Sequence, residues 1–540
     1  MRKTLFLALA ALMLGVPVAH ATDYDPILDQ VQQSAFNYMW NEANPANGLV
    51  KDRASGAYCS IASVGFALSS ICVGIDHGWI TRAQGAARVQ TTLNTFWTLP
   101  QGPQTSGTIG YKGFFYHFIH LSDGLRDGTS ELSDIDTALL LAGILDCQQY
   151  FNGPDPVEVN IRSLADQIYR RVDWTFFRNG TGGLMRSWRP NGGAGVFDTA
   201  IWTGYNEMMI LYILAFGSPT FPIPGSDWAK YTSTYVYGTQ FGQTYVQYGA
   251  LFTHQYSHCW IDFRNKRDPY MQALVPPSDY FQNSRKATLA QQAYCIANPG
   301  LKSPGPPGSP DPAAYTATYW GLTAGDDPIS GYAAHGAPGP GTNDNGTVQP
   351  TAVVCSLPFA ADVCLPTIQN LYDNHPLLWG TYGFKDGLNK CRNPDWYDTD
   401  FLGIDQGPMV MMIENYRNAS IWQRFMQNPY IQAGMTAAGF VSTVGVDDPP
   451  SFEQGVTLWS TPNPFSSRTA LKYRLPQAGS VRLSVHDAAG REVARPVNEW
   501  QNAGDHVAHF DANGLPNGVY WYRLEIPGSK VVGGRGVLMR

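Results

Sequence analysis

Hydrophobic residues recur at spacings of three and four along most of this chain, from about Tyr24 to Phe440. This spacing places apolar side chains on one face of a helix, so it predicts a long all-helical region. The segments that show it are Ile27–Trp40, Ile61–Ile75, Ala83–Trp97, Asp134–Tyr150, Ile161–Phe177, Tyr205–Phe216, Ala287–Ile296, Val353–Tyr372 and Met409–Tyr416.

The predicted helices are of two kinds. Ala138–Leu145 is apolar nearly all round, which is typical of a helix covered on every side. Ile161–Phe177 carries a charged face and should lie at the surface. Alternation of the two kinds predicts an inner ring of helices wrapped by an outer ring, an α/α barrel. An irregular helical array is the alternative.

The hydrophobic period changes near the C-terminus. Val446–Pro450 has the composition of a linker, which we place at residues 446–455. Beyond it Val481–Val485, His506–Phe510 and Val519–Leu524 alternate between apolar and polar residues. This pattern predicts about six or seven short strands in a small antiparallel sandwich over residues 456–540.

The first 21 residues are typical of a secretory signal. Arg2 and Lys3 precede the apolar stretch Leu5–Val16, and Ala19–Ala21 is a small-x-small cleavage site. The apolar stretch is shorter than the roughly 20 residues that span a bilayer. We therefore expect a soluble, exported protein that begins at Thr22 and is periplasmic, extracellular or attached to the cell surface.

Composition narrows the class of partner. Charged residues make up 15% of the chain and the net charge is −7, which argues against nucleic acid or anionic lipid. Aromatic residues make up 13%, and many lie in glycine-rich loops, where rings either complete the core or stack on sugars. Two Pro/Gly-rich insertions, Pro299–Pro312 and His335–Thr342, are typical of binding-site walls or lids.

The eight cysteines all lie in the helical region, and their spacing selects no disulfide pairing. Export would permit disulfides. Cys72 and Cys147, however, fall within apolar helical segments, where a buried free thiol is the simpler interpretation.

Acidic residues gather where the apolar helices are predicted to begin, in Ser130–Thr137, Trp202–Glu207 and Tyr397–Pro408. In a ring of parallel inner helices the N-terminal ends share one mouth, so these carboxylates would meet in one pocket. Cleavage of a glycosidic bond uses such a set, with one carboxyl group kept protonated and a second one ionised.

Helix capping is the alternative role for some of these acids. Ser133 and Asp136 have the spacing of a capping box, and Asp405 is a plausible N-cap. Glu131 precedes the cap, and Glu207 is expected about four residues inside its helix, so capping explains neither. Glu207, Asp405 and Glu131 are therefore the catalytic candidates.

A second polar cluster runs from His254 to Arg264. His254 and His258 are four residues apart and could bind zinc on one helix face, but Asp262 is the only further ligand in sight. We instead expect His254, Tyr256 and Arg264 to contact sugar hydroxyls and His258 to lie in a buried network. We predict no metal and no cofactor.

Several stretches of the helical region, residues 22–445, resemble the bacterial glucoamylase-like family, which includes endo-β-1,2-glucanases with an (α/α)6 barrel. The stretches that carry the resemblance are Ser60–Phe66, Gly113–Phe118, Glu131–Gly143, Tyr205–Tyr212, His254–His258, Tyr280–Arg285, Trp320–Thr323 and Gly403–Pro408.

The resemblance implies roles for the candidate residues. Glu207 matches the general acid of related β-1,2-glucanases, and the base would come from Asp405 or its neighbour Asp400. Glu131 falls in a motif of essential acids and would be the acid/base in related transglycosylating domains. The residues we expect to contact substrate are Asp134, Asp136, Trp202, Tyr205, His254, Tyr256, Arg264, Asn283, Trp320 and Asp400.

The tail resembles the FlgD-type Ig-like module of exported bacterial proteins. Asn463–Phe465, Val485–Val493 and Leu515–Arg523 carry this likeness. It implies sorting or retention at the cell surface through the secretion machinery. A carbohydrate-binding module or a spacer are the alternatives.

Taken together, the sequence predicts a secreted, monomeric glycoside hydrolase that acts on β-glucan, with endo cleavage of β-1,2-glucan as the first expectation. The alternatives are a transglycosylase, a hydrolase of another β-glucan, and a protein that binds glycan without cutting it.

Overall fold

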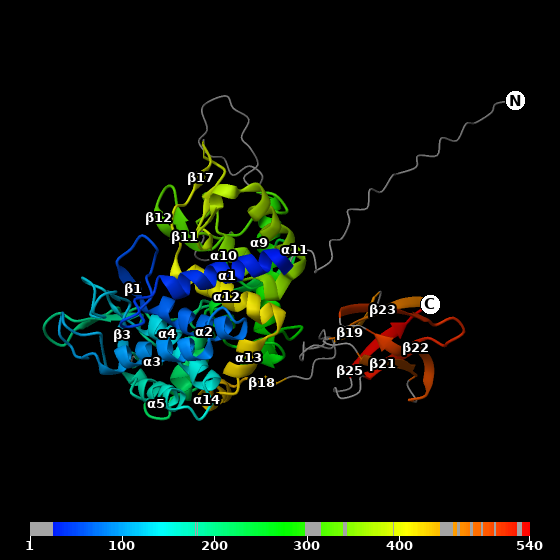
Figure 1. Ribbon diagram of the computed structural model, residues 1–540, viewed down its shortest axis with the longest axis horizontal. Coiled ribbons are helices and arrows are strands. Elements are labelled where there is room, and N and C mark those ends of the chain that lie inside the picture. The colour runs from blue at the N-terminus through cyan, green and yellow to red at the C-terminus, as the bar shows by residue number, and fades with distance from the viewer. Residues whose placement is uncertain are drawn as a thin grey trace.

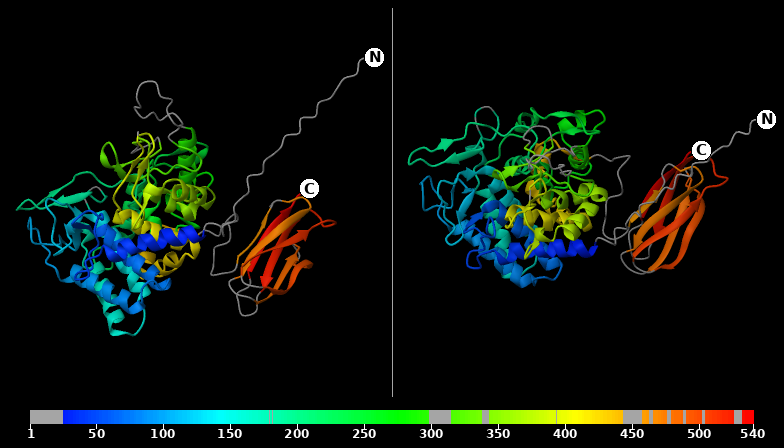
Figure 2. Two further views of the ribbon diagram at one scale, coloured as in Figure 1. Left: turned by 45° about the horizontal axis from the view of Figure 1, so that its top comes forward. Right: turned by 90° about the horizontal axis from the view of Figure 1, so that it is seen from above.

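The computed structural model describes residues 25–297 except 179 and 181, 315–337, and 343–442 except 393. In the C-terminal part it describes 457–461, 465–475, 479–487, 490–501, 504–525 and 532–540. The predicted signal peptide, the insertion Pro299–Pro312, residues 338–342 of the second insertion and the linker 446–455 lie outside these ranges. The described chain consists of a helical part, blue to yellow in Figure 1, and a body of β-strands, orange to red (Figures 1 and 2).

Four helices with almost wholly buried side chains form the centre of the helical part. They are α2 (Ile61–Asp76), α4 (Asp134–Tyr150), α6 (Met209–Gly217) and α12 (Gly403–Arg417). Helix α12 packs beside α2, α2 beside α4, and α4 beside α6. A Cβ atom on Gly143 would lie 2.0 Å from the carbonyl oxygen of Gly65, so α2 and α4 approach closely only because both positions are glycine.

Helices with one exposed face cover this centre. Helix α1 (Asp25–Asn41) packs on α2 and α12, α5 (Pro156–Arg170) packs on α3 (Arg82–Thr98) and α4, and α14 (Pro429–Ala437) packs on α6. The predicted two-layer arrangement is therefore present in the described residues. The remaining α-helices are α7 (Asp227–Thr232), α8 (Pro269–Ala273), α9 (Tyr280–Ala297), α10 (Pro350–Val354), α11 (Leu357–Asn374) and α13 (Ser420–Phe425).

Several predicted helix boundaries were wrong. Helix α6 begins at Met209 rather than Tyr205, because the Asn206 side chain accepts the backbone N–H of Met208 at 3.1 Å and so competes with the first helical turn. Glu207 therefore lies in the loop before α6, not inside the helix. The segment Val353–Tyr372 is divided between α10 and α11.

The predicted bounds of the helix Ile161–Phe177 were also wrong at both ends. Helix α5 starts earlier, at Pro156, and ends at Arg170, and the short 3-10 helix η2 (Trp174–Phe176) follows it. Asp155 caps α5 by accepting the N–H of Val157, and Pro156 occupies the first helical position.

Short strands that the sequence analysis did not anticipate lead into the central helices. β2 (Gly110–Tyr111), β3 (Phe114–Tyr116), β5 (Leu132–Ser133), β6 (Ser187–Arg189) and β7 (Val196–Phe197) form one antiparallel sheet, and β5 continues directly into α4. Strands of two or three residues are too short to show an alternating pattern.

The other short strands occur in pairs or triplets. They are β1 (Tyr58–Ser60), β4 (Phe118–His120), β8 (Tyr237–Gln240), β9 (Gln243–Val246), β10 (Lys266–Arg267), β11 (Ala324–Asp327), β12 (Gly331–Ala334), β13 (Thr347–Val348), β14 (Trp379–Gly380), β15 (Gly383–Phe384), β16 (Leu388–Asn389), β17 (Trp396–Tyr397) and β18 (Val441–Ser442).

The C-terminal part consists of two antiparallel sheets that share a hydrophobic core including Leu471, Leu483 and Phe510. One sheet has the order β19-β20-β23 and the other β22-β21-β24-β25. The strands are β19 (Thr457–Thr461), β20 (Arg468–Leu475), β21 (Gly479–His486), β22 (Glu492–Gln501), β23 (Gly504–Asp511), β24 (Gly518–Glu525) and β25 (Val532–Leu538). The change to a strand period after the linker is confirmed.

All eight cysteines are buried and free. The Sγ atoms of Cys72 and Cys147 lie 3.8 Å apart between α2 and α4, so the prediction of buried free thiols is confirmed for this pair. Among the described residues, we find no helix with both the length and the apolar character needed to cross a bilayer.

Candidate active site

Glu207 lies in the loop immediately before α6, and Ser257 holds this loop in place. The Ser257 hydroxyl donates to the Glu207 carbonyl oxygen at 2.8 Å and accepts the N–H of Ile210 at 3.1 Å. The Glu207 side chain keeps part of its surface exposed. Desolvation, reinforced by the nearby carboxylate of Asp136 and opposed by Arg186, raises the pKa of Glu207 to about 7. Glu207 can therefore carry a proton near neutral pH.

His117 lies between two acids near the N-terminus of α4, Glu131 and Asp136. Its Nδ1 lies 2.9 Å from Glu131 Oε1, and its Nε2 lies 3.7 Å from Asp136 Oδ1. Burial opposes a charge on this ring, but Asp136 and Glu131 outweigh burial and raise the pKa of His117 to about 9. The imidazolium form therefore holds both carboxylates in place.

Glu131 is held in its ionised form. His117 is the main cause, and Arg189, whose Nη2 lies 3.2 Å from Glu131 Oε2, adds to it. Together they lower the pKa of Glu131 to about 2. A group this acidic is a poor proton donor near neutral pH, so this environment favours Glu207 over Glu131 as the acid.

Asp136 has the capping role that was the alternative at sequence level. Its backbone N–H donates to the Ser133 hydroxyl at 3.1 Å, and the same hydroxyl donates to the Asp136 carboxylate at 2.5 Å. The remaining carboxylate oxygen faces His117. Asp136 thus stabilises the N-terminus of α4 through Ser133. It also lies close enough to Glu207 to raise the pKa of that side chain.

Asp134, which the sequence analysis expects to contact substrate, is fully buried. Its Oδ1 accepts the indole N–H of Trp202 at 3.2 Å, while Oδ2 has no hydrogen-bond partner among the described residues. Burial raises the pKa of Asp134 well above its usual range. The guanidinium of Arg186 lies 4.9 Å from the Trp202 ring centre. Asp134 therefore holds the Trp202 ring against Arg186, the cation that lowers the pKa of Glu207.

Asp405 lies in the first turn of α12. The N-cap is Leu402, so the capping role considered for Asp405 was wrong. Asp405 is buried, and its Oδ2 has no hydrogen-bond donor among the described residues. Burial raises the pKa of Asp405 to about 7, and Asp326, Asp52 and Asp398 add to the shift, whereas the neighbouring carboxyl group of Asp386 lowers it.

Asp400, the other candidate base, is pinned by donors. Its Oδ1 accepts the N–H groups of Ser55 at 3.1 Å and Phe401 at 2.9 Å, and the Ser55 hydroxyl donates to Oδ2. Arg53 Nη1 lies 3.9 Å from the same oxygen. A carboxylate held this way is suited to shaping the site, which leaves Asp405 as the candidate base.

Asp52 connects the two groups of acids. It raises the pKa of Asp405, and its own pKa is raised by burial and by Asp136 and lowered by Arg53 and His117. Asp136 in turn acts on Glu207. The structure thus brings the acidic segments before α6, at the start of α4 and at the start of α12 within electrostatic reach of one another.

One set of carboxylates meets the distance requirement for a metal ion. Oxygens of Asp326, Asp386 and Asp398 lie within 4.8 Å of one another, and oxygen-only sets suit hard cations. Arg53 Nη1, however, already pairs with Asp326 Oδ2 at 2.9 Å. We therefore assign no metal to this set.

The histidine pair considered for zinc does not form a ligand set. His254 and His258 lie in two separate 3-10 helices, η3 (Leu251–His254) and η4 (Tyr256–Cys259), rather than on one α-helix. His258 Nε2 lies 3.1 Å from the Ser284 hydroxyl, and Asp262 pairs with Arg264 at 2.8 Å. Burial lowers the pKa of both histidines to about 3. Both are neutral members of a buried network.

Four residues that the sequence analysis expects to bind substrate are buried: Tyr205, His254, Asn283 and Trp320. Trp320 is fully buried, and Asn283 exchanges two hydrogen bonds with the backbone of Val246. Tyr205 is buried, with its ring centre 4.7 Å from that of His254. These side chains offer a sugar no accessible surface, because they complete the core.

Arg264 and Tyr256 are also engaged by the protein. Arg264 forms a bidentate pair with Asp262, and its guanidinium lies 4.6 Å from the Trp422 ring centre. The Tyr256 hydroxyl donates to the Ile404 carbonyl oxygen at 3.1 Å. Tyr256 therefore supports the turn that carries Asp405, and Arg264 lies in a separate ion pair.

Sequence reasoning missed His117, Arg53, Asp52 and Asp386. His117 had a signal, because it lies within the motif Gly113–Phe118 that carries the family resemblance. The other three stand outside every such motif, and only the fold shows that they face Asp405 or its neighbours.

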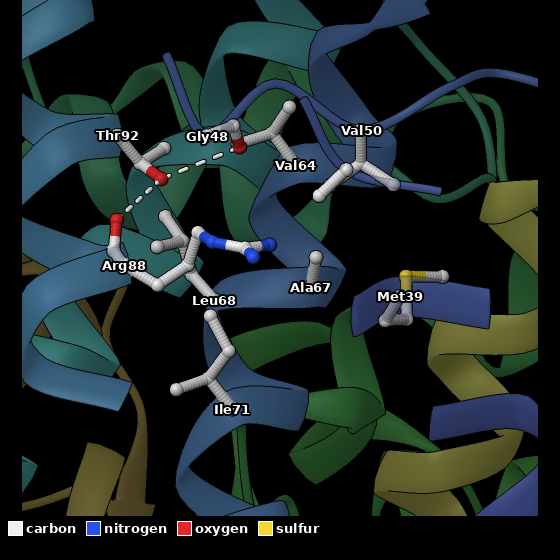
Figure 3. Close-up of a pocket in the computed structure, with 10 residues that line it drawn as sticks. Met39, Gly48, Val50, Val64, Ala67, Leu68, Ile71, Arg88 and Thr92 are labelled. Carbon is white, nitrogen blue, oxygen red and sulfur yellow. Dashed lines mark hydrogen bonds between the residues drawn. The ribbon is translucent and has the colours of Figure 1, made fainter. Parts of the chain in front are cut away.

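A small cavity lies apart from these acids, between α1, α2 and α3 (Figure 3). Its volume is about 10 Å³, and Met39, Val50 and Leu68 are among its apolar lining residues. Thr92 donates to the carbonyl oxygen of Gly48 at 3.3 Å beside it. Such a volume holds at most one water molecule, so this cavity is a packing defect rather than a ligand site.

Comparison with known proteins places this arrangement in a family. A family model described as "Putative glucoamylase" matches residues 199–429. A crystal structure of a "putative glucoamylase" from Bacteroides uniformis is 32% identical, has a TM-score of 0.67, and covers 78% of this chain and 98% of its own. The solved neighbours are (α/α)6-barrel enzymes, so the predicted barrel is confirmed for the helical part.

Two further relatives have named activities. An endo-β-1,2-glucanase from Chitinophaga pinensis, solved with sophorotriose and glucose, is 28% identical with a TM-score of 0.66 over 78% of this chain and 99% of its own. An exo β-1,2-glucooligosaccharide sophorohydrolase from Parabacteroides distasonis is 31% identical over 449 residues, which is 76% of this chain. This chain spans 57% of the length of that curated relative.

Proposed function

Because the chain belongs to the glucoamylase-like family, we propose that it is a glycoside hydrolase that cleaves β-1,2-glucan. Two relatives with named activities, one endo-acting and one exo-acting, work on this linkage. We keep endo cleavage, the expectation from sequence, as the mode to be tested.

The observation that carries the proposal is the contrast between two glutamates at one site. Glu207 is desolvated, with its pKa at about 7, while Glu131 is held ionised by His117 and Arg189. Glycosidases need one carboxyl group that still holds its proton at the working pH. Glu207 supplies that group: it lies in a loop, and its side chain remains partly exposed.

Glu207 donates its proton to the glycosidic oxygen as the bond to the anomeric carbon breaks. Asp405 accepts a proton from the water that attacks this carbon, so the charge of the site is conserved over the step. Trp202, which is partly exposed beneath Arg186, offers a flat apolar face for a sugar ring.

The test is incubation of the purified protein with linear and cyclic β-1,2-glucans and with β-1,3- and β-1,4-glucans, followed by chromatography of the products. We expect new reducing ends from β-1,2-glucan alone. A ladder of oligosaccharides indicates endo attack, and release of sophorose alone indicates exo attack.

The alternatives give different results in the same assay. Products longer than the substrate would identify a transglycosylase, and cleavage of another linkage would replace the proposed substrate. Binding of glucan without any new reducing end would reject the hydrolase proposal in favour of a binding protein.

We further propose that residues 456–540 are an Ig-like tail of the FlgD type that retains an exported, monomeric enzyme at the cell surface. The strand period and the two sheets around one core support this reading. Fractionation of the source cells tests it: we expect the full chain in the surface fraction, with an N-terminus at Thr22. A chain found in the cytoplasm with Met1 intact would contradict it.

A further inference from the structure

A second carboxyl group, Asp386, lies beside the candidate base Asp405, and we propose that the two share one proton, with Asp386 as its main holder. Asp386 is then a positioning residue, which keeps a hydrogen bond on Asp405. This inference rests on the proposed function, because it assigns Asp386 a role in the reaction through Asp405.

The fold clamps Asp386 in one place. It follows β15, and its backbone N–H donates to the Asp400 carbonyl oxygen at 3.2 Å. Its Oδ2 accepts the backbone N–H of Asp326 in β11. A Cβ atom on Gly325 would lie 2.9 and 3.0 Å from the two carboxyl oxygens, so only glycine at that position leaves room for this carboxyl group.

Each carboxyl group of the pair keeps one buried oxygen for which the described residues supply no donor. Asp386 Oδ1 and Asp405 Oδ2 are buried and find no hydrogen-bond donor among the described residues. The two carboxyl groups are nevertheless hydrogen-bonding neighbours. Ionised carboxylates only accept hydrogen bonds, so this contact requires a proton on one of them.

The surroundings place that proton on Asp386. Burial, with the charge of Asp405 next in size, raises the pKa of Asp386 well above its usual range. The hydrogen bond from Asp386 acts in the opposite direction on Asp405 and lowers the pKa of that group. Asp386 is 2% exposed, so no solvent stabilises its ionised form.

The nearby cation is already engaged. Arg53 lies 2.9 Å from Asp326, 3.6 Å from Asp52 and 3.9 Å from Asp400, and none of these three ion pairs includes Asp386. Among the described residues, the titratable and charged groups that face the Asp386–Asp405 pair are Asp52, Asp326, Asp398, Asp400, Arg53, Tyr256, Tyr332 and Cys355. Acids outnumber cations in this set, which favours a retained proton.

The shared proton has a consequence for the reaction. While Asp386 keeps the proton, Asp405 receives a hydrogen bond that fixes its rotamer and stabilises its ionised form. Asp405 is then ready to accept a proton from water. Without Asp386, the carboxyl group of Asp405 would be buried with no donor on Oδ2.

Two substitutions separate a neutral donor from an ionised group. In Asp386→Asn, the amide oxygen can accept the N–H of Asp326 and the amide N–H can donate to Asp405, as the protonated acid would. We expect this variant to keep kcat on β-1,2-glucan within about tenfold of the wild type. Asp386→Ala removes the donor, and we expect kcat to fall at least about a hundredfold.

A readout that does not depend on activity uses the melting temperature as a function of pH. An acid whose pKa is raised on folding favours the folded state at low pH and opposes it as the pH rises through the folded pKa. The wild type should therefore lose stability relative to Asp386→Asn as the pH rises above about 4, the pKa of an ordinary aspartate. Asp268→Asn, which alters a buried acid bonded to Trp228 and Tyr280, is the matched control for the activity test and should keep kcat on β-1,2-glucan close to that of the wild type.

Three results would overturn the proposal. The first is that Asp386→Asn is as inactive as Asp386→Ala, which would mean that the ionised form is required. The second is that the difference in melting temperature between the wild type and Asp386→Asn does not vary with pH. The third is that a chelator lowers, and calcium restores, the melting temperature of the wild type but not of Asp386→Asn, which would place a cation where we place the proton.

Failure of the proposed function gives a different pattern from failure of this inference. If the wild type cleaves no β-glucan, the proposed function fails, and the melting experiment still decides where the proton lies. If the wild type is active and Asp386→Asn is not, only the shared proton is rejected.

Discussion

Glu207 and Glu131 have the same side chain but opposite surroundings. Glu131 accepts hydrogen bonds from two cationic groups, which stabilise its ionised form. Desolvation and a nearby carboxylate destabilise the ionised form of Glu207. The difference explains how one site can hold an ionised and a protonated glutamate at the same pH. From sequence, both were candidates of the same kind, because the partners that distinguish them, His117 and Arg189, are distant along the chain.

The pair of His117 and Glu131 predicts a stability maximum in mildly acidic solution. The pKa of Glu131 is lowered to about 2, so its contribution is complete above about pH 4.5 and is lost as the pH falls toward 2. The pKa of His117 is raised to about 9, so its contribution is complete below about pH 6.5 and is lost as the pH rises through 9.

The stability that the wild type has over His117→Gln should therefore be greatest between about pH 4.5 and 6.5, at about 1–2 kcal/mol after allowance for partial exposure. Thermal unfolding of both proteins across this range measures it. His120→Gln, at an exposed histidine paired with Asp127 at 3.0 Å, is the control. A difference that does not vary with pH would contradict the charged pair.

Arg186 offers a prediction about the pH dependence of catalysis. Its charge lowers the pKa of Glu207, so Arg186→Gln should raise that pKa and keep Glu207 protonated to higher pH. The alkaline limb of the kcat profile should move upward by a few tenths of a pH unit or more. An alkaline limb that moved downward would contradict the placement of Arg186 beside the acid.

At the scale of elements, the long central helices were predictable and their ends were not. Helix α4 begins and ends where the apolar period does, because the Ser133 cap is local. Helix α6 starts later than its apolar period, because Asn206 forms a local turn and Ser257, remote in sequence, takes the N–H of Ile210. The short strands that lead into α4 depend on pairing between distant segments, which no local pattern reports.

The close approach of α2 and α4 predicts a sensitive position. A methyl group on Gly143 would lie 2.0 Å from the Gly65 carbonyl oxygen, so Gly143→Ala must push the two helices apart. We expect a loss of about 3 kcal/mol in the free energy of unfolding, measured by denaturant titration. Gly193→Ala, at a loop position with an ordinary contact at 3.4 Å, should change stability by less than about 0.5 kcal/mol.

At the scale of the whole molecule, the order of helical and strand periods was enough to predict a barrel followed by a β-strand body. The acidic segments at the helix starts also identified the region where Asp136 acts on Glu207 and on Asp52, which in turn acts on Asp405. Asp386 and Arg53 could not be found this way, because isolated charged residues in loops carry no periodic signal. Trp320 and Asn283, which were expected to bind substrate, lie buried in the core, because a family motif can preserve packing as well as binding.

The central claim, that Glu207 is the proton donor of a β-1,2-glucan hydrolase, is tested most directly by the leaving-group dependence of Glu207→Gln. We compare kcat/KM on linear β-1,2-glucan with kcat/KM on an aryl β-sophoroside whose phenol leaves without a proton. The account predicts a loss of about 10²–10⁴-fold on the glucan and a much smaller loss on the aryl substrate, with an unchanged melting curve. Equal losses on both substrates, or no loss on the glucan, would contradict it.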